Sequence, residues 1–193
     1  MPNLFIIAGC NGAGKTTASF TILPEMLDCK EFVNADEIAK GLSPFQPEMV
    51  SFQAGRIMIE RIDELLHSGV DFAFETTLTT LSYLNTIRLA KEKGYTIHLI
   101  YFWLNDVDLA IERVKMRVSE GGHDIPEEII IRRYYRGMYN LTNRFTHICD
   151  YWIIIDNSSQ PFTFVAEGQR AIELKIYNFI TWQQIKDHPN KAD

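Results

Sequence analysis

Short runs of apolar residues alternate along the chain with longer segments in which apolar residues recur every three or four positions. The short runs predict buried strands, and the longer segments predict helices with one apolar face. Such alternation is typical of a mostly parallel sheet covered by helices on both faces. The expected strands are Asn3–Ala8, Glu31–Asn34, Phe72–Glu75, Thr96–Leu104 and Tyr151–Ile155. The expected helices are Lys15–Leu27, Glu48–His67, Leu81–Lys93, Val107–Ser119 and Glu127–Asn143.

Helix-breaking residues divide the second half of the chain. Gly121, Gly122 and Pro126 interrupt one long helical stretch, which predicts two helices joined by a short loop. We therefore expect a helical hairpin over about residues 107–143. The segment Thr163–Lys186 has a weaker pattern and predicts a short extended piece followed by a terminal helix.

A glycine-rich loop lies between the first expected strand and the first expected helix. It fits the pattern G-x-x-x-x-G-K-[ST]. The strand before it and the helix after it distinguish this motif from a chance glycine-rich turn. In such a loop the backbone N–H groups surround phosphate oxygens, Lys15 reaches the β- and γ-phosphates, and the Thr16 hydroxyl ligates Mg²⁺. We predict ATP (or GTP) and Mg²⁺ as cofactors. The predicted nucleotide-binding residues here are Gly9, Asn11, Gly12, Ala13, Gly14, Lys15, Thr16 and Thr17.

This loop in this position indicates the P-loop NTPase fold. We expect three layers, α/β/α, around a parallel five-stranded sheet in the nucleoside-kinase-like order 2-3-1-4-5. The whole chain, residues 1–193, would then be a single P-loop kinase domain. The sequence lacks the N-K-x-D motif of GTPases, and Phe72–Glu75 matches only imperfectly the acidic motif of motor and AAA-type ATPases.

Acidic residues end two further strands, and the carboxyl ends of parallel strands meet at the edge where ligands bind. Asp36 follows the second strand and is our candidate general base, which would take a proton from the attacking acceptor hydroxyl. Capping of the next helix is the alternative role for Asp36. Glu75 ends the third strand, followed by Thr76 and Thr77. We expect Glu75 either to bind acceptor hydroxyls or to hold a Mg²⁺-bound water.

Arginines cluster on the expected hairpin. A hairpin rich in arginine suits a lid that closes over the triphosphate and neutralises charge in the transition state. Surface ion pairing, for example between Glu128 and Arg132, is the plainer alternative. His123, beside the double glycine, is a further candidate for contact with substrate or phosphate. The hairpin arginines are Arg113, Arg117, Arg132, Arg133 and Arg136.

Composition narrows the cellular setting and the possible partners. The net charge of -6 disfavours nucleic acid, because phosphate backbones are bound by clustered positive charge. No apolar stretch approaches the length of a membrane helix, and the first residues lead into a strand without the features of a signal peptide. Three cysteines without C-x-x-C spacing favour a reducing compartment and no zinc site. We therefore expect a cytoplasmic protein that binds neither nucleic acid nor membrane.

Taken in order, the motifs resemble the zeta toxin family of P-loop kinases. After the phosphate loop come Asn34-Ala35-Asp36, then Phe72-Ala73-Phe74-Glu75-Thr76-Thr77-Leu78, then the arginine stretch from Arg113 through Gly121-Gly122 to Arg133. Asp156-Asn157-Ser158 resembles the family loop near the adenine, which adds Asn157 to the predicted nucleotide-binding residues. The resemblance implies an ATP-dependent kinase with Asp36 as base. It also implies that Glu75 and Thr77 lie near the acceptor and that Arg117 and Arg133 are lid cations.

The resemblance also suggests an acceptor. Well-known zeta toxins resemble kinases of UDP-N-acetylglucosamine that phosphorylate the 3'-hydroxyl and are neutralised by a small antitoxin. The sequence itself gives no support for an antitoxin-like partner. Asp36, Glu75, Thr76 and Thr77 would suit a neutral polyhydroxylated group, because sugar hydroxyls donate to carboxylates. An anionic part of the acceptor would need a cation, for which Arg56 is the candidate, with a plain helix surface as the alternative.

Two other functions fit the same motifs. The first is a nucleotide or antibiotic kinase that resembles chloramphenicol phosphotransferase or the adenylate kinases. The second is a nucleotide-binding switch without turnover, which would not need Asp36 as a base. Phosphoryl transfer to any small-molecule acceptor excludes the pure switch.

Overall fold

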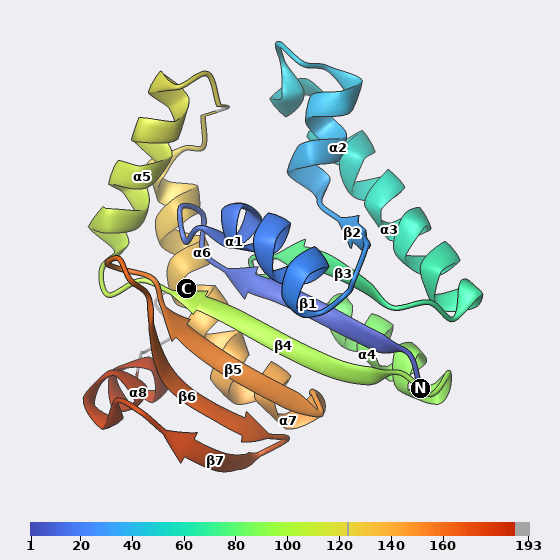
Figure 1. Ribbon diagram of the computed structural model, residues 1–193. Helices are drawn as coiled ribbons and strands as arrows, with labels where there is room; N and C mark the ends of the chain where they lie inside the picture. The colour runs from blue at the N-terminus through green and yellow to red at the C-terminus, as the bar shows by residue number, and fades with distance from the viewer. Residues whose placement is uncertain (123, 188–193) are drawn as a thin grey trace.

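The computed structural model describes residues 1–122 and 124–187, and a mixed seven-stranded sheet runs through its centre (Figure 1). The strand order is β2-β3-β1-β4-β5-β6-β7, with β1 to β5 parallel and β6 and β7 antiparallel. The strands are β1 (Asn3–Gly9), β2 (Glu31–Val33), β3 (Phe72–Thr76), β4 (Thr96–Trp103), β5 (Tyr151–Asp156), β6 (Thr163–Gln169) and β7 (Ile172–Ile176).

All five predicted strands and their order are confirmed, but the prediction of a purely parallel five-stranded sheet is wrong. Residues 163–176 form a hairpin that extends the sheet beyond β5, where one short extended piece was expected. Arg170, with a φ of 52°, lies in the tight connection between its strands. The hairpin gave a weak signal because each residue of β7 is exposed, so no burial pattern marks this strand.

The helices are α1 (Lys15–Thr21), α2 (Ala35–Leu42), α3 (Ser51–Ser68), α4 (Tyr83–Glu92), α5 (Val107–Ser119), α6 (Glu127–Asn140), α7 (Thr146–Ile148) and α8 (Phe179–Lys186). Wider turns extend α1 over Ile22–Met26 and α6 over Leu141–Phe145, and a 3-10 turn, Pro47–Val50, precedes α3. Helix α2 was not predicted. It begins because the Asn34 side chain accepts hydrogen bonds from the N–H groups of Asp36 and Glu37, at 2.8 and 3.4 Å.

The central strands are buried on both faces, which accounts for their continuous apolar runs. Ile6 and Phe74 on one face of the sheet, and Ile7 and Ala73 on the other, are at most 1% exposed. A strand buried in this way lies between two helical layers, as a parallel sheet requires. The sheet therefore provides a rigid support on which the loops at its carboxyl edge are positioned.

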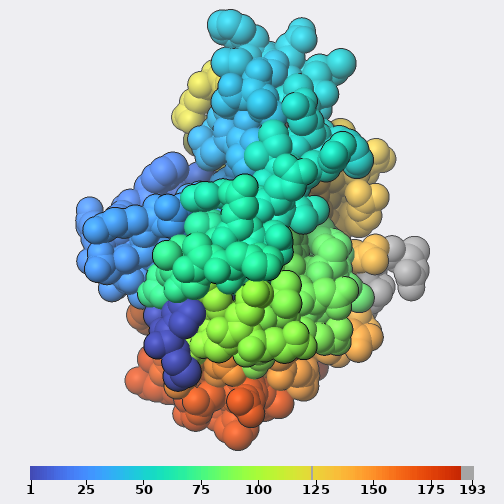
Figure 2. Space-filling view, turned by 90° about the vertical axis from the view of Figure 1, so that its right-hand side faces the viewer, coloured from blue at the N-terminus to red at the C-terminus, as the bar shows by residue number. Residues whose placement is uncertain are grey.

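Two helical arms rise from this carboxyl edge. Figure 1 shows α2 and α3 on one side and α5 with the first turns of α6 on the other, with the phosphate loop and α1 between them. In the space-filling view, α2 and the start of α3 project from the body of the molecule (Figure 2). The predicted site residues come from the phosphate loop, from the arms, and from the carboxyl ends of β3 and β5.

Candidate active site

The phosphate loop leaves β1 at Gly9 and enters α1 at Lys15. Gly9, Gly12 and Gly14 have φ values of 144°, 77° and 83°, which side chains disfavour. A Cβ on Gly9 would also lie 2.3 Å from the carbonyl oxygen of Phe102, and one on Gly14 would lie 2.5 Å from Nδ2 of Asn157. The glycines of the motif are thus required both by backbone conformation and by close packing.

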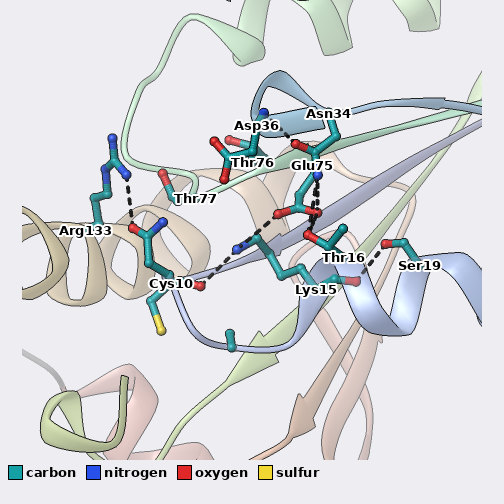
Figure 3. A network of polar contacts seen from close by, with 12 residues as sticks. Cys10, Lys15, Thr16, Ser19, Asn34, Asp36, Glu75, Thr76, Thr77 and Arg133 are labelled. Atoms are coloured by element: carbon teal, nitrogen blue, oxygen red, sulfur yellow. Dashed lines mark hydrogen bonds and ion pairs between the residues drawn. The ribbon is translucent and has the colours of Figure 1, made fainter. Parts of the chain in front are cut away.

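Lys15 points into the loop rather than into solvent, with only 6% of its surface exposed. Its Nζ donates a hydrogen bond to the carbonyl oxygen of Cys10 at 2.9 Å and lies 3.4 Å from Oε1 of Glu75 (Figure 3). The Thr16 hydroxyl donates to the other carboxylate oxygen of Glu75 at 2.8 Å. Glu75 therefore lies against the two side chains that the motif assigns to phosphate and Mg²⁺.

Asn34 completes this cluster. No role was predicted for this residue from the sequence. Its Nδ2 donates to Oε2 of Glu75 at 2.8 Å and lies 3.4 Å from the Thr16 hydroxyl, while its Oδ1 caps α2. The helix-capping role that was considered for Asp36 is thus performed by Asn34. An asparagine before an acidic first turn is a recognisable cap signal, but its bond to Glu75 joins residues 41 positions apart.

Asp36 and Arg133 lie on the same side of the phosphate loop as Glu75 (Figure 3). Asp36 is half-buried in the first turn of α2, and Arg133 reaches over from α6. Nη1 of Arg133 donates to Oδ1 of Asn11 at 3.1 Å. Burial lowers the pKa of Arg133, whereas the Asp36 carboxylate raises it, so this cation and the candidate base share one electrostatic environment.

The other lid arginines differ in their surroundings. Arg113 donates to the carbonyl oxygens of Gly12 at 3.5 Å and Ser158 at 3.1 Å, so it fastens α5 to the phosphate loop. Arg117 is half-buried one turn further on, and a Cβ on Gly122 would lie 2.7 Å from its Cγ. His123 lies outside the described residues.

The two threonines after Glu75 belong to a tight bend. The Thr76 hydroxyl accepts a hydrogen bond from the Leu78 N–H at 3.1 Å, and Leu78 has a φ of 57°. Helix α6 holds the bend in place, since Asn140 donates to the Leu78 carbonyl at 2.7 Å. A Cβ on Gly137 would lie 2.6 Å from the Thr77 carbonyl oxygen. The bend is therefore packed directly against the helix that carries Arg133.

Two predicted residues lie apart from this cluster. Asn157 donates from Nδ2 to the Ala13 carbonyl at 2.9 Å and packs against Gly14, so its side chain supports the phosphate loop. Arg56 is exposed on α3 and makes no hydrogen bond or ion pair with the parts of the chain that the structure describes. The structure brings together Lys15, Thr16, Asp36, Glu75 and Arg133 without Arg56.

Two side chains of the cluster carry oxygens of the kind that a magnesium ion binds. Within residues 1–122 and 124–187, no group of three or more His, Cys, Asp or Glu side chains is arranged to hold a metal. Mg²⁺ does not need such a group, because it keeps several waters and binds through one or two protein oxygens together with substrate phosphates. The Thr16 hydroxyl and the Glu75 carboxylate, 2.8 Å apart, provide oxygens of this type.

Sequence comparison decides the family. The family model described as Zeta toxin matches residues 1–164, which is most of the chain. The chain belongs to the zeta toxin family. A protein of Haemophilus influenzae, described as uncharacterized, is 35% identical over 128 residues, which cover 65% of this chain and 88% of that protein.

Several solved structures share the fold of this zeta toxin family member. The AvrRxo1-ORF1:AvrRxo1-ORF2 complex with ATP contains a chain that matches with a TM-score of 0.74 at 17% identity. The match covers 96% of the present chain and 63% of that chain. The PezAT toxin–antitoxin system of Streptococcus pneumoniae matches with a TM-score of 0.66 at 19% identity, over 86% and 72% of the two chains. A gluconokinase of Sinorhizobium meliloti shares the fold with a TM-score of 0.53 at 13% identity, over 82% and 83%. None of the described helices is both long and apolar enough to cross a membrane.

Cys10 lies inside the phosphate loop, and its reactivity is open to test. Burial raises its pKa to about 11, although the nearby Lys15 lowers it. Because the thiolate is the reactive form, a pKa this high leaves almost no nucleophile at neutral pH.

We expect native protein to resist iodoacetamide at pH 7.5 and to react at all three cysteines after unfolding in guanidinium. Cys29 and Cys149 are buried too, with pKa values raised by burial to about 11 and about 12. Rapid alkylation of native Cys10, measured by peptide mass spectrometry, would contradict this expectation.

Proposed function

We propose that this zeta toxin family kinase transfers the γ-phosphoryl group of ATP, in a Mg²⁺-dependent reaction, to a hydroxyl of a small molecule. The observation that carries the proposal is the placement of Asp36 and Arg133 on one side of the cluster formed by Lys15, Thr16 and Glu75. A carboxylate opposite a phosphate-binding lysine is the arrangement that transfer to a hydroxyl requires.

The residues divide the reaction between them. Lys15 and the backbone N–H groups of the loop bind the β- and γ-phosphates, and Thr16 ligates Mg²⁺, which neutralises charge on the phosphate oxygens. Asp36 accepts the proton as the acceptor oxygen bonds to the γ-phosphorus and the bond to the β-γ bridging oxygen breaks, releasing ADP. Arg133, with Arg117 from α5, stabilises the charge on the transferring group.

Glu75 takes the metal-side role in this proposal. Its carboxylate bonds to Thr16, Lys15 and Asn34, so it would orient a water of the Mg²⁺ shell more readily than an acceptor hydroxyl. The Glu75→Gln variant should therefore need a higher Mg²⁺ concentration for half-maximal rate, while the acceptor KM changes little. Glu31→Gln, at the start of β2 and paired with Arg61 on the surface, is the matched control. A raised acceptor KM with unchanged Mg²⁺ dependence would assign Glu75 to the acceptor instead.

The arginine hairpin is proposed to act as a lid in which only the last turn of α5 and the first residues of α6 move. Arg113 holds α5 to the phosphate loop, and Tyr134 donates to the Leu104 carbonyl at 2.7 Å, which anchors α6. Arg133 lies beside this anchor and contacts the phosphate loop through Asn11. The residues of α6 that precede Arg133, together with the last turn of α5, are then the part of the lid that closes over the triphosphate.

Loss of Arg133 should affect catalysis more than binding. We expect Arg133→Ala to lower kcat by roughly 10²-fold with a smaller change in the ATP KM, because charge on the phosphoryl group grows in the transition state. The matched control is Arg132→Ala, since Arg132 is the exposed neighbour on the same helix. Equal effects of both substitutions in steady-state kinetics would remove Arg133 from the mechanism.

For the acceptor we propose a UDP-sugar such as UDP-N-acetylglucosamine. Asp36 and the hydroxyls of Thr76 and Thr77 suit a polyhydroxylated group, and Arg56, exposed on α3, is the candidate cation for its diphosphate. The likeness to zeta toxins supports this choice, and the likeness to a toxin–antitoxin system supports an antitoxin-like protein partner. A structure of the same fold solved with ATP supports ATP as the donor.

The test is incubation of the protein with ATP, Mg²⁺ and UDP-N-acetylglucosamine, followed by mass spectrometry. We expect a product with one added phosphate that depends on Asp36. Transfer to a nucleoside or an antibiotic, with none to the UDP-sugar, would replace this acceptor and leave the kinase assignment intact. Nucleotide binding without transfer to any acceptor in a metabolite screen would favour the nucleotide-binding switch.

A further inference from the structure

Strand β7 forms the outer edge of the sheet, and no other element of the described chain pairs with its free side (Figure 1). All five of its residues are exposed. The exposed fractions are 65% for Ile172, 59% for Leu174 and 36% for Ile176. Unpaired backbone groups beside apolar side chains form a template onto which another strand can add.

The sequence of β7, Ile-Glu-Leu-Lys-Ile, is complementary to itself in one antiparallel register. Against β6 the register shifts between Glu173 and Lys175, so Leu174 lies at a bulge. On the free side of the strand, pairing two copies about Leu174 places Leu174 opposite itself, Ile172 opposite Ile176 and Glu173 opposite Lys175. Opposite charges on directly facing residues stabilise strand pairs, and like charges destabilise them. Centring the pair on Glu173 or on Lys175 would place like charges directly opposite each other. A parallel in-register pair would do the same.

Apolar surface continues past the C-terminal end of the strand. Phe162, Phe164 and Tyr177 form an aromatic cluster beside β7, with ring centroids 5.9 and 5.6 Å apart, and each is between 42% and 44% exposed. Phe179 and Ile180, at the start of α8, are 63% and 72% exposed. A stable interface buries about 800 Å² on each partner, more than one short strand provides, and these side chains add to it.

The position of β7 leaves the candidate active site open. The site lies at the ends of β1, β2 and β3, whereas β7 is at the opposite edge of the sheet from β2. The strand also lies beyond residue 164, where the match to the family ends.

We propose that two copies of this chain associate through β7, pairing antiparallel about a two-fold axis at Leu174 to form one continuous sheet. The register is set by the two facing Glu173–Lys175 pairs, and the flanking aromatic residues are covered by the association. Glu173 also accepts hydrogen bonds from Trp182 and Lys186 of α8, so this residue holds α8 against the hairpin and is left unchanged in the test.

The first test measures mass in solution by sedimentation velocity over a range of concentrations. We expect a reversible dimer for the wild type and a monomer for Leu174→Lys and for Lys175→Glu, because the latter opposes Glu173 with a second acid. The matched control is Ile59→Lys on α3, where the exposed fraction is 61%, and this variant should still dimerise. Circular dichroism establishes that each variant is folded. A monomeric wild type, or a dimer that survives both β7 substitutions, would overturn the proposal.

The second test fixes the register by disulfide trapping. The three native cysteines are buried, so a cysteine introduced on β7 is the exposed thiol available to the oxidant diamide. Leu174→Cys should form a covalent dimer with itself, because facing residues of an antiparallel pair are close enough for a disulfide. Ile172→Cys should link poorly to itself but readily to an Ile176→Cys copy. Efficient self-linking of Ile172→Cys without linking of Leu174→Cys would overturn the register.

Discussion

Replacing Lys15 with methionine will lower phosphoryl transfer by at least roughly 10²–10³-fold, since a charged donor aimed at the transferring phosphate is lost. Methionine keeps the length of the side chain, which is 94% buried, whereas alanine would open a space beneath the loop. Glu75 keeps its hydrogen bonds from Thr16 and Asn34, so the thermal unfolding midpoint should change little. Initial rates with saturating ATP and Mg²⁺ measure the effect.

Lys40→Met is the matched control for this prediction. Lys40 is an exposed lysine of α2 that pairs with Glu37 at 2.6 Å, and its loss should leave turnover near the wild-type rate. Near wild-type turnover of Lys15→Met would remove the basis for phosphoryl transfer at this loop. A large fall in the unfolding midpoint would show that Lys15 acts mainly through its structural contacts.

Asp36→Asn should lower kcat by roughly 10²–10⁴-fold while ATP binding is largely kept, because the amide cannot accept the acceptor proton. The substitution preserves shape, and the cap of α2 is unaffected since Asn34 makes it. The Asp36 carboxylate raises the pKa of Arg133, and the substitution removes this negative charge.

Glu37→Gln tests whether the loss belongs to Asp36 alone. Glu37 is the next residue in the same first turn, and its carboxylate pairs with Lys40 on the surface. We expect nearly unchanged kinetics for this control. Equal losses of ATP affinity and turnover in Asp36→Asn, measured by calorimetry and by steady-state rates, would point to a metal-binding role in place of a general base.

Local patterns in the sequence were enough to locate the phosphate loop, the five parallel strands and the acids that follow them. Each of these features depends on local properties of the chain. Gly9, Gly12 and Gly14 adopt backbone conformations that side chains disfavour, and the central strands are buried at both faces. The order of the parallel strands also followed, because right-handed crossovers leave few arrangements. Beyond β5 the terminal helix was predicted correctly, but the hairpin was missed because β7 has an exposed side chain at each position and no burial pattern.

Only the tertiary structure decided how these residues meet. Asn34 bonds to Glu75 across 41 positions, Thr16 to Glu75 across 59, and Arg133 to Asn11 across 122. No local pattern encodes such pairs, because they depend on which strands become neighbours in the sheet and how α6 packs over the loop. The sequence by itself therefore determined where the phosphate loop and its Lys15 lie in the chain. The packing decided that Glu75 faces Thr16 and that Asp36 and Arg133 share one side of the phosphate loop, because both arms are anchored to the same sheet.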